Sequence, residues 1–185
     1  MSLFKKKKTQ NYKNETQNYK EAQIIFFSHG GNPFHMWQDD VLAEYEKYKV
    51  PKTIENMWLN DIKESLLSKI KSTNNPEKLI FIGEYINLLD YASAVDFLIN
   101  TLDNYCGDTF SFIILIEKLK DISNKVNNDL KEKIEAKVKV YKDLALKQEI
   151  VIDDYHKKLP YMKDYDFSPE NIIKRINEIQ KQHRF

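Results

Sequence analysis

Apolar residues recur at spacings of three and four along most of the chain, as they do in α-helices with one buried face. The first stripe contains Phe34, Trp37, Val41, Tyr45 and Tyr48. It predicts a single helix that starts at Pro33, because Asn32 can cap free amides and proline is tolerated in a first turn. Pro51 ends the helix, since proline disfavours helical geometry in the residue before it.

Further stripes of the same kind follow. One keeps a strict spacing of four and contains Ile54, Trp58, Ile62, Leu66 and Ile70. Others predict helices over residues 76–89, 91–105, 109–122 and 129–148, and a last helix that begins at Ser168 and Pro169. Asn75, Asp90 and Asp108 stand just ahead of three of these helices, and their side chains can accept hydrogen bonds from free first-turn amides.

Residues 76–105 and 109–148 are predicted to form two consecutive helix hairpins. Their length falls within the ~30 to 47 residues of helical repeats. In helix length, hairpin spacing and apolar stripe, this part of the chain resembles HEAT-like α-solenoid proteins. The resemblance implies stacked antiparallel hairpins, with an irregular helical bundle as the other arrangement, and it carries over no site residue. We therefore predict an all-α fold.

An α/β fold is the alternative. Residues 79–82, 112–116 and 149–152 are rich in β-branched or aromatic residues, as buried strands are. However, cap residues precede the first two runs, and the chain has only four glycines for turns. These two observations favour the all-α interpretation.

Length and composition predict one folded domain with an arm. Residues 1–23 are polar and include the four consecutive lysines Lys5–Lys8, which predicts a flexible basic arm. Residues 24–185 are predicted to form a single helical domain. No stretch approaches the ~20 apolar residues of a membrane span, and no apolar signal segment follows the lysines. We therefore expect no membrane partner and a cytoplasmic protein.

The charge pattern bears on the partners of the protein. The 29 basic and 28 acidic residues give a formal net charge of +1, so no global field attracts nucleic acid. Only Arg175 and Arg184 are arginines, the side chains preferred for reading base edges. These observations argue against nucleic acid as a partner. RNA bound by Lys5–Lys8, with Tyr12 and Tyr19 stacked on bases, stays open as a third hypothesis.

Residues 28–40 hold two of the four histidines, two of the four glycines and one of the two tryptophans. If a helix starts at Pro33, His35 and Asp39 share one face, and His29 can fold back from the preceding loop. Two imidazoles and a carboxylate are the minimal ligand set of a catalytic zinc or iron ion. A metal-dependent hydrolase or oxygenase around His29, His35 and Asp39 or Asp40 is therefore a candidate, although no His-Glu-x-x-His motif accompanies it.

Other chemistry is excluded by the inventory of residues. His29-Gly30-Gly31 is similar to the oxyanion loop of α/β-hydrolases, which also need a Gly-x-Ser-x-Gly nucleophile turn. The remaining glycines, Gly83 and Gly107, cannot supply that turn or a glycine-rich phosphate loop. The single cysteine, Cys106, excludes an intramolecular disulfide and any multi-cysteine zinc site.

Aromatic and acidic residues are candidates for contacts with another protein. Trp37 and Trp58 can anchor a partner, but their helical phase with aliphatic neighbours predicts core packing for both. Asp153 and Asp154 begin an acidic, tyrosine-rich connector over residues 153–167, predicted to be a loop that wraps the helices. Their carboxylates can meet a cation or a basic partner, although a solvated loop is the simpler interpretation.

These patterns predict a non-enzymatic protein-interaction module, either an adaptor or an immunity-like protein, that binds a partner protein through a helical surface without a cofactor. As an immunity protein it would cover the basic face of a toxin. The candidate binding residues are His29, His35, Trp37, Asp39, Asp40, Asp153 and Asp154. The metal enzyme is the competing hypothesis.

Overall fold

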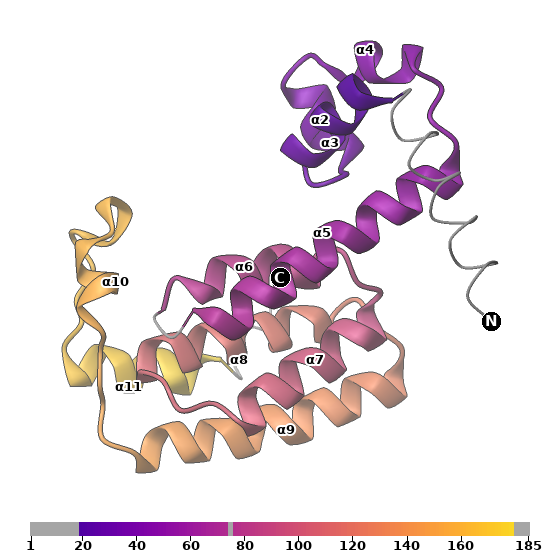
Figure 1. Ribbon diagram of the computed structural model, residues 1–185. Helices are drawn as coiled ribbons and strands as arrows, with labels where there is room; N and C mark the ends of the chain where they lie inside the picture. The colour runs from indigo at the N-terminus through magenta and orange to yellow at the C-terminus, as the bar shows by residue number, and fades with distance from the viewer. Residues whose placement is uncertain (1–18, 74–75, 180–185) are drawn as a thin grey trace, which may run out of the picture. The chain divides into compact units, whose positions relative to one another are not determined.

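A computed structural model of the protein describes residues 19–73 and 76–179, and this part of the chain is all-α (Figure 1). Its helices are α2 (Lys20–Ser28), α3 (Pro33–Gln38), α4 (Leu42–Lys47), α5 (Lys52–Ser72), α6 (Lys78–Ile86), α7 (Tyr91–Asp103), α8 (Thr109–Ser123), α9 (Asn128–Lys147), α10 (Asp154–Lys158) and α11 (Pro169–Glu178), with a short 3₁₀ helix, η1, over Pro160–Met162. The described residues form no strand, so the α/β alternative is not supported.

Some predictions concern residues outside the described ranges. These are the basic arm as far as residue 18, with Lys5–Lys8 and Tyr12, and the cap at Asn75. Residues 20–23, which the sequence assigned to the arm, form the first turn of α2, and Ala22 is fully buried. No helix in the described ranges has the length and apolar character to cross a bilayer.

Contacts within the chain divide it into two compact units, Met1–Leu66 and Leu67–Phe185. The boundary falls inside α5, a helix whose apolar stripe showed no break in the sequence. A unit defined by contacts is not by itself an independently folding domain, so the single domain over residues 24–185 stays a prediction. Each unit is described separately.

The first unit has a small aromatic core supplied by α2 to α5. The buried residues are Ala22, Phe26, Met36, Tyr45, Ile54 and Trp58. The Phe26 ring lies 5.3 Å from the Trp58 ring and 5.9 Å from the Tyr45 ring, measured between centroids. Burial of Ile54, Trp58 and Leu66 confirms the inward face predicted for this stretch of α5.

The single helix predicted from Pro33 to Val50 is wrong, because the chain leaves helical geometry between α3 and α4. Asp40 has φ +57°, its amide donates to the Trp37 carbonyl, and the Val41 amide donates to the Met36 carbonyl at 2.9 Å. These two bonds form the motif that commonly closes an α-helix. The break changes which residues of the stripe face the core.

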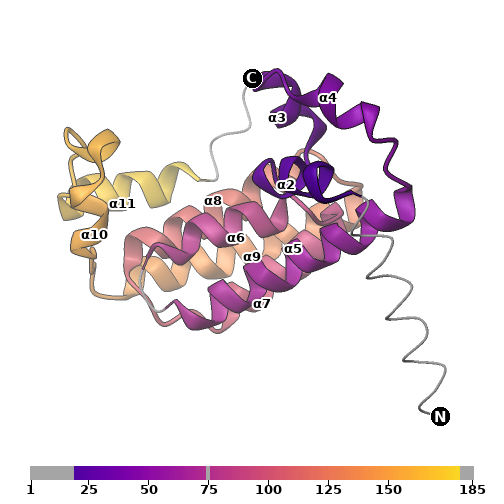
Figure 2. The ribbon, with the colours of Figure 1, turned by 45° about the horizontal axis from the view of Figure 1, so that its top comes forward.

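The second unit is built around α8, whose buried residues lie on nearly every side of the helix. Helices α7 and α9 pack against α8 (Figures 1 and 2), and α11 packs against α9. The run 112–116, which favoured a strand, belongs to α8. A helix that is apolar all round is stable when neighbours cover it, so tertiary packing decided against the strand.

Two caps predicted in this unit are present and share one pattern. Asp90 accepts from the Ser93 amide at 2.9 Å and from the Ser93 hydroxyl at 2.7 Å. Asp108 accepts from the Ser111 amide at 3.1 Å and from the Ser111 hydroxyl at 2.5 Å. Both carboxylates thus satisfy a free first-turn amide, and Asp-x-x-Ser is the local sequence signal in each case.

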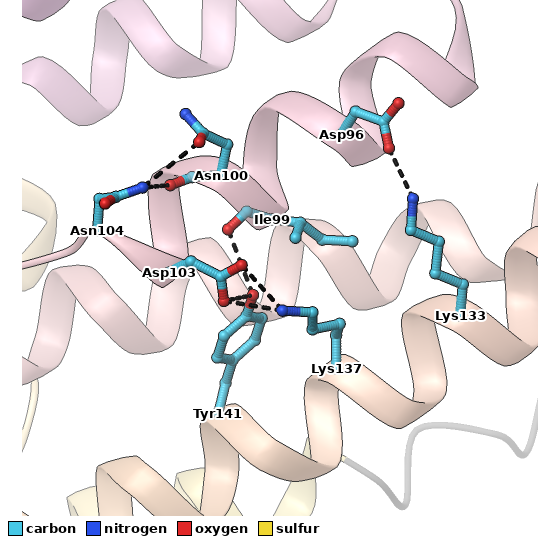
Figure 3. A network of polar contacts seen from close by, with 8 residues as sticks. All are labelled: Asp96, Ile99, Asn100, Asp103, Asn104, Lys133, Lys137 and Tyr141. Carbon is cyan, nitrogen blue, oxygen red and sulfur yellow. Dashed lines mark hydrogen bonds and ion pairs between the residues drawn. The ribbon is translucent and has the colours of Figure 1, made fainter.

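Polar contacts join α7 to α9 along one edge of the second unit (Figure 3). The Tyr141 hydroxyl donates to Asp103 at 2.7 Å, and the Lys137 ammonium donates to both Asp103 oxygens at 2.9 Å. Burial and the Asp103 hydrogen bond raise the pKa of Tyr141, while the bonds from Lys137 and Tyr141 lower that of Asp103. Lys133 and Asp96 form a further ion pair on this edge.

Tyr141→Phe is expected to lower the free energy of unfolding by about 1 kcal/mol, the net value of one hydrogen bond. The loss stays modest because Asp103 keeps its ion pair with Lys137. Urea unfolding followed by circular dichroism measures the change. Tyr161→Phe is the matched control, since Tyr161 is 79% exposed, and equal losses for both variants would contradict a role of the Tyr141 hydroxyl.

Candidate functional site

The segment over residues 28–40 is shaped by a glycine turn at the end of α2. The Gly31 amide donates to the Phe26 carbonyl at 2.8 Å, and the Gly30 amide donates to the Phe27 carbonyl at 3.2 Å. Gly30 and Gly31 have φ values of +59° and +70°, a region that glycine reaches without a steric penalty. The side chain of Asn32 then accepts from the Phe34 amide and caps α3, as predicted.

His29 connects the ends of two helices. Its Nδ1 lies 2.6 Å from the Ile25 carbonyl of α2, and its Nε2 lies 3.2 Å from Oδ2 of Asp39, which ends α3. Both contacted atoms are acceptors, so the ring satisfies both contacts when each nitrogen carries a proton. The structure thus brings together two of the predicted site residues, and their contact orients α3 relative to the glycine turn.

The structure does not assemble the third residue of the hypothetical metal site. His35 lies on the exposed part of α3, with its ring 6.2 Å from that of Phe34. Nowhere in the described ranges do three His, Cys, Asp or Glu side chains form a group able to hold a metal ion. Within this part of the chain, His29 and Asp39 therefore form a helix-to-helix contact and no three-ligand set.

Trp37 is exposed, contrary to the predicted core packing. It is 63% exposed and Phe34 is 58% exposed, whereas their neighbour Met36 is 1% exposed. The rings of Phe34 and Trp37 stack with centroids 5.9 Å apart and an interplanar angle of 29°. The physical reason is the break at Asp40: because α3 is only six residues long, it buries one side chain, and that side chain is Met36.

Acidic residues follow this short helix in the sequence. Between residues 34 and 46 the chain carries Asp39, Asp40, Glu44 and Glu46 but no lysine or arginine. All four carboxylate residues are exposed. We call Phe34, Trp37, Asp39 and Asp40 the α3 surface, because it combines a pair of exposed rings with two neighbouring carboxylates.

Asp153 and Asp154 have local structural roles. Asp153 caps α10 by accepting from the Tyr155 amide at 2.8 Å, and Asp154 pairs with Lys157 of the same short helix at 3.1 Å. The connector predicted as a loop over residues 153–167 therefore contains α10 and η1. Both aspartates keep exposed carboxylates, but their contacts explain their presence without a partner.

Sequence reasoning missed a buried polar cluster between α8 and α10. His156 is 2% exposed, and its Nε2 lies 2.9 Å from the Ser111 hydroxyl and 3.4 Å from Oδ1 of Asp108. Burial raises the pKa of Tyr105, which lies close to this cluster, to about 12. The Asp-x-x-Ser pattern at residues 108–111 signalled the cap, but no local pattern pointed to His156, which is 45 residues further along the chain.

The cluster resembles a Ser-His-Asp triad in composition but not in geometry. In a triad the histidine accepts the serine proton and the carboxylate orients the other ring nitrogen. Here the serine proton goes to Asp108, so Ser111 accepts from Nε2–H of His156, and Nδ1 has no hydrogen-bond partner among the described residues. Ser111 is also fully buried. The cluster therefore fastens α10 to the start of α8.

Comparison with known protein families, curated proteins and solved structures found no match. The function is therefore inferred from the side chains of this chain and their geometry.

Proposed function

We propose that this protein is a non-enzymatic protein-interaction module that binds its partner through the α3 surface. The observation that carries the proposal is the stacked and exposed pair of rings, Phe34 and Trp37. Tryptophan is among the residues that most often contribute strongly to binding at protein interfaces. Large aromatic side chains gain most when they leave water, and these two rings gain little of that energy within the described structure.

The backbone that carries the two rings is fixed by hydrogen bonds. Hydrogen-bonded turns close α2 and α3, Asn32 caps the start of α3, and the His29 contact with Asp39 ties the two helices together. A surface that is ordered before binding loses less conformational entropy on association. The α3 surface therefore suits recognition by a preformed site, as in an adaptor or an immunity-like protein. We also propose that the protein acts in the cytoplasm and that its helices form a helical repeat.

A photoreactive residue in place of Phe34 tests the proposal. With p-benzoylphenylalanine at this position, irradiation of cells that produce the protein should crosslink a defined partner. The control carries the same residue in place of Tyr161, another exposed aromatic residue, and should not crosslink that partner. Equal capture of the same proteins from both positions would contradict a binding site on α3.

Trp37→Ala is expected to weaken binding of the purified partner by at least about thirtyfold, because interface tryptophans of this kind often contribute about 2 kcal/mol or more. Isothermal titration calorimetry measures the dissociation constant. The variant should fold normally, since the indole is mostly exposed. Tyr161→Ala is the control. An unchanged dissociation constant for Trp37→Ala would show that Trp37 does not contribute to the interface.

A further inference from the structure

The charge of the α3 surface indicates what kind of partner it fits. From Phe34 to Glu46 every residue with a formal charge is acidic. Asp39 contacts His29, whereas Asp40, Glu44 and Glu46 form no ion pair with other described residues. Complementary charge steers association and disfavours partners of the same sign.

The exposed rings also favour a positively charged partner. The face of an indole attracts a cation, and arginine is the commonest partner in such contacts. The Asp40 amide donates to the Trp37 carbonyl at 3.2 Å, so Asp40 lies in the turn that closes α3, three residues after Trp37, and it is exposed. A cationic segment that covers the exposed indole can also meet this carboxylate, which forms no ion pair with other described residues, and arginine can use both its flat face and its N–H groups.

We infer that the partner is a protein that presents a cationic segment, with an arginine over the Trp37 indole and a neighbouring basic group paired with Asp40. This inference rests on the proposed function, because it identifies the partner of the same surface. The other sources of such a segment are the lysines Lys5–Lys8 of this chain and a second copy of it. The rings distinguish an arginine-bearing segment from Lys5–Lys8, since lysine lacks the planar group that stacks on an indole, and a second copy is distinguished by the crosslinking test.

The first test maps the segment that crosslinks to the photoreactive residue in place of Phe34. Mass spectrometry of the crosslinked peptide should identify a stretch of the partner protein that contains arginine and carries net positive charge. A neutral or acidic stretch would overturn the inference but leave the proposed function intact. Crosslinks to Lys5–Lys8, or to a second copy of the chain, would also overturn it. Absence of any specific crosslink would contradict the proposed function itself.

The second test uses Asp40→Asn with the purified partner. Asparagine tolerates the positive φ of this position, so the variant removes the charge and keeps the turn. Binding should weaken by about threefold to tenfold, with a smaller dependence on salt concentration. Asp61→Asn, which neutralises an exposed carboxylate on α5, should leave binding unchanged. Equal binding and equal salt dependence for Asp40→Asn and the unmodified protein would overturn the inference.

Discussion

Gly31→Ala is expected to destabilise the first unit by about 2 to 4 kcal/mol, through backbone strain and overpacking together. Gly31 has φ +70°, and a Cβ atom at this position would lie 2.8 Å from Cδ2 of Leu59 and 2.8 Å from Cε1 and Cζ of Phe26. The Phe26 ring is buried among Trp58 and Tyr45, so it cannot move aside without disturbing the small core.

Gly30→Ala is the matched control for Gly31→Ala. Its φ is +59°, but no atom lies within 4 Å of the Cβ position. This variant should therefore lose only about 1 to 2 kcal/mol from the backbone conformation. Both tryptophans of the chain lie in the first unit, so urea unfolding followed by tryptophan fluorescence reports on this unit. Equal losses for the two variants would show that the close packing around Gly31 is unimportant.

Asp108→Ala is expected to lower the free energy of unfolding by about 2 to 4 kcal/mol, because it removes a helix cap and leaves buried donors without their acceptor. Those donors are the amide and the hydroxyl of Ser111. Urea unfolding followed by circular dichroism measures the loss. Asp90→Ala is the matched control, because the same Asp-x-x-Ser cap is solvent-exposed there.

The Asp90→Ala loss should be clearly smaller, since water replaces the lost acceptor at an exposed cap. Losses of equal size would mean that the buried cluster adds nothing beyond the cap.

The stability of Asp108→Ala should also depend on pH differently from that of the unmodified protein. Burial raises the pKa of Asp108, but hydrogen bonds from His156 and Ser111 outweigh it and hold the pKa below its ordinary value.

A carboxylate with a depressed pKa in the folded state contributes its full stabilisation above the pKa of the unfolded state. It loses that contribution as the pH falls through the folded-state pKa. Below about pH 5, where unfolded aspartate begins to bind protons, the stability of the unmodified protein should therefore fall more steeply than that of Asp108→Ala. Parallel curves over this range would contradict the role of the ionised carboxylate.

The sequence predicted the features of the fold that depend on local pattern. Periodicity located α5 to α9 and α11 but missed α2 and α10, and the residue types at Asn32, Asp90 and Asp108 located three caps that the structure contains. It failed where a distant contact or a short break decides the outcome. Asp40 closes α3 in a conformation that glycine usually supplies, so nothing in the stripe signalled that the helix would end there.

The same limit affected the candidate site. The sequence identified residues 28–40 as unusual and named His29, Asp39 and Trp37, but it placed Trp37 in the core because a continuous helix would have turned it inward. The structure buries Met36 instead. His156 was beyond prediction for another reason, since its partners lie on α8 and only tertiary packing brings them together. Spacing predicts helix faces well, but it does not predict which residues meet across the core.

The apolar surface of α8 is exposed for part of the time during synthesis of the chain. During synthesis from the N-terminus, α7 leaves the ribosome before α8, whereas α9 and α11 follow it. Helix α8 is buried by neighbours from both sides of the sequence, so the nascent chain exposes part of its apolar surface until α9 has emerged. Such exposed surface favours aggregation and binding by chaperones. The chain is thus vulnerable to aggregation while residues 123 to 147 emerge.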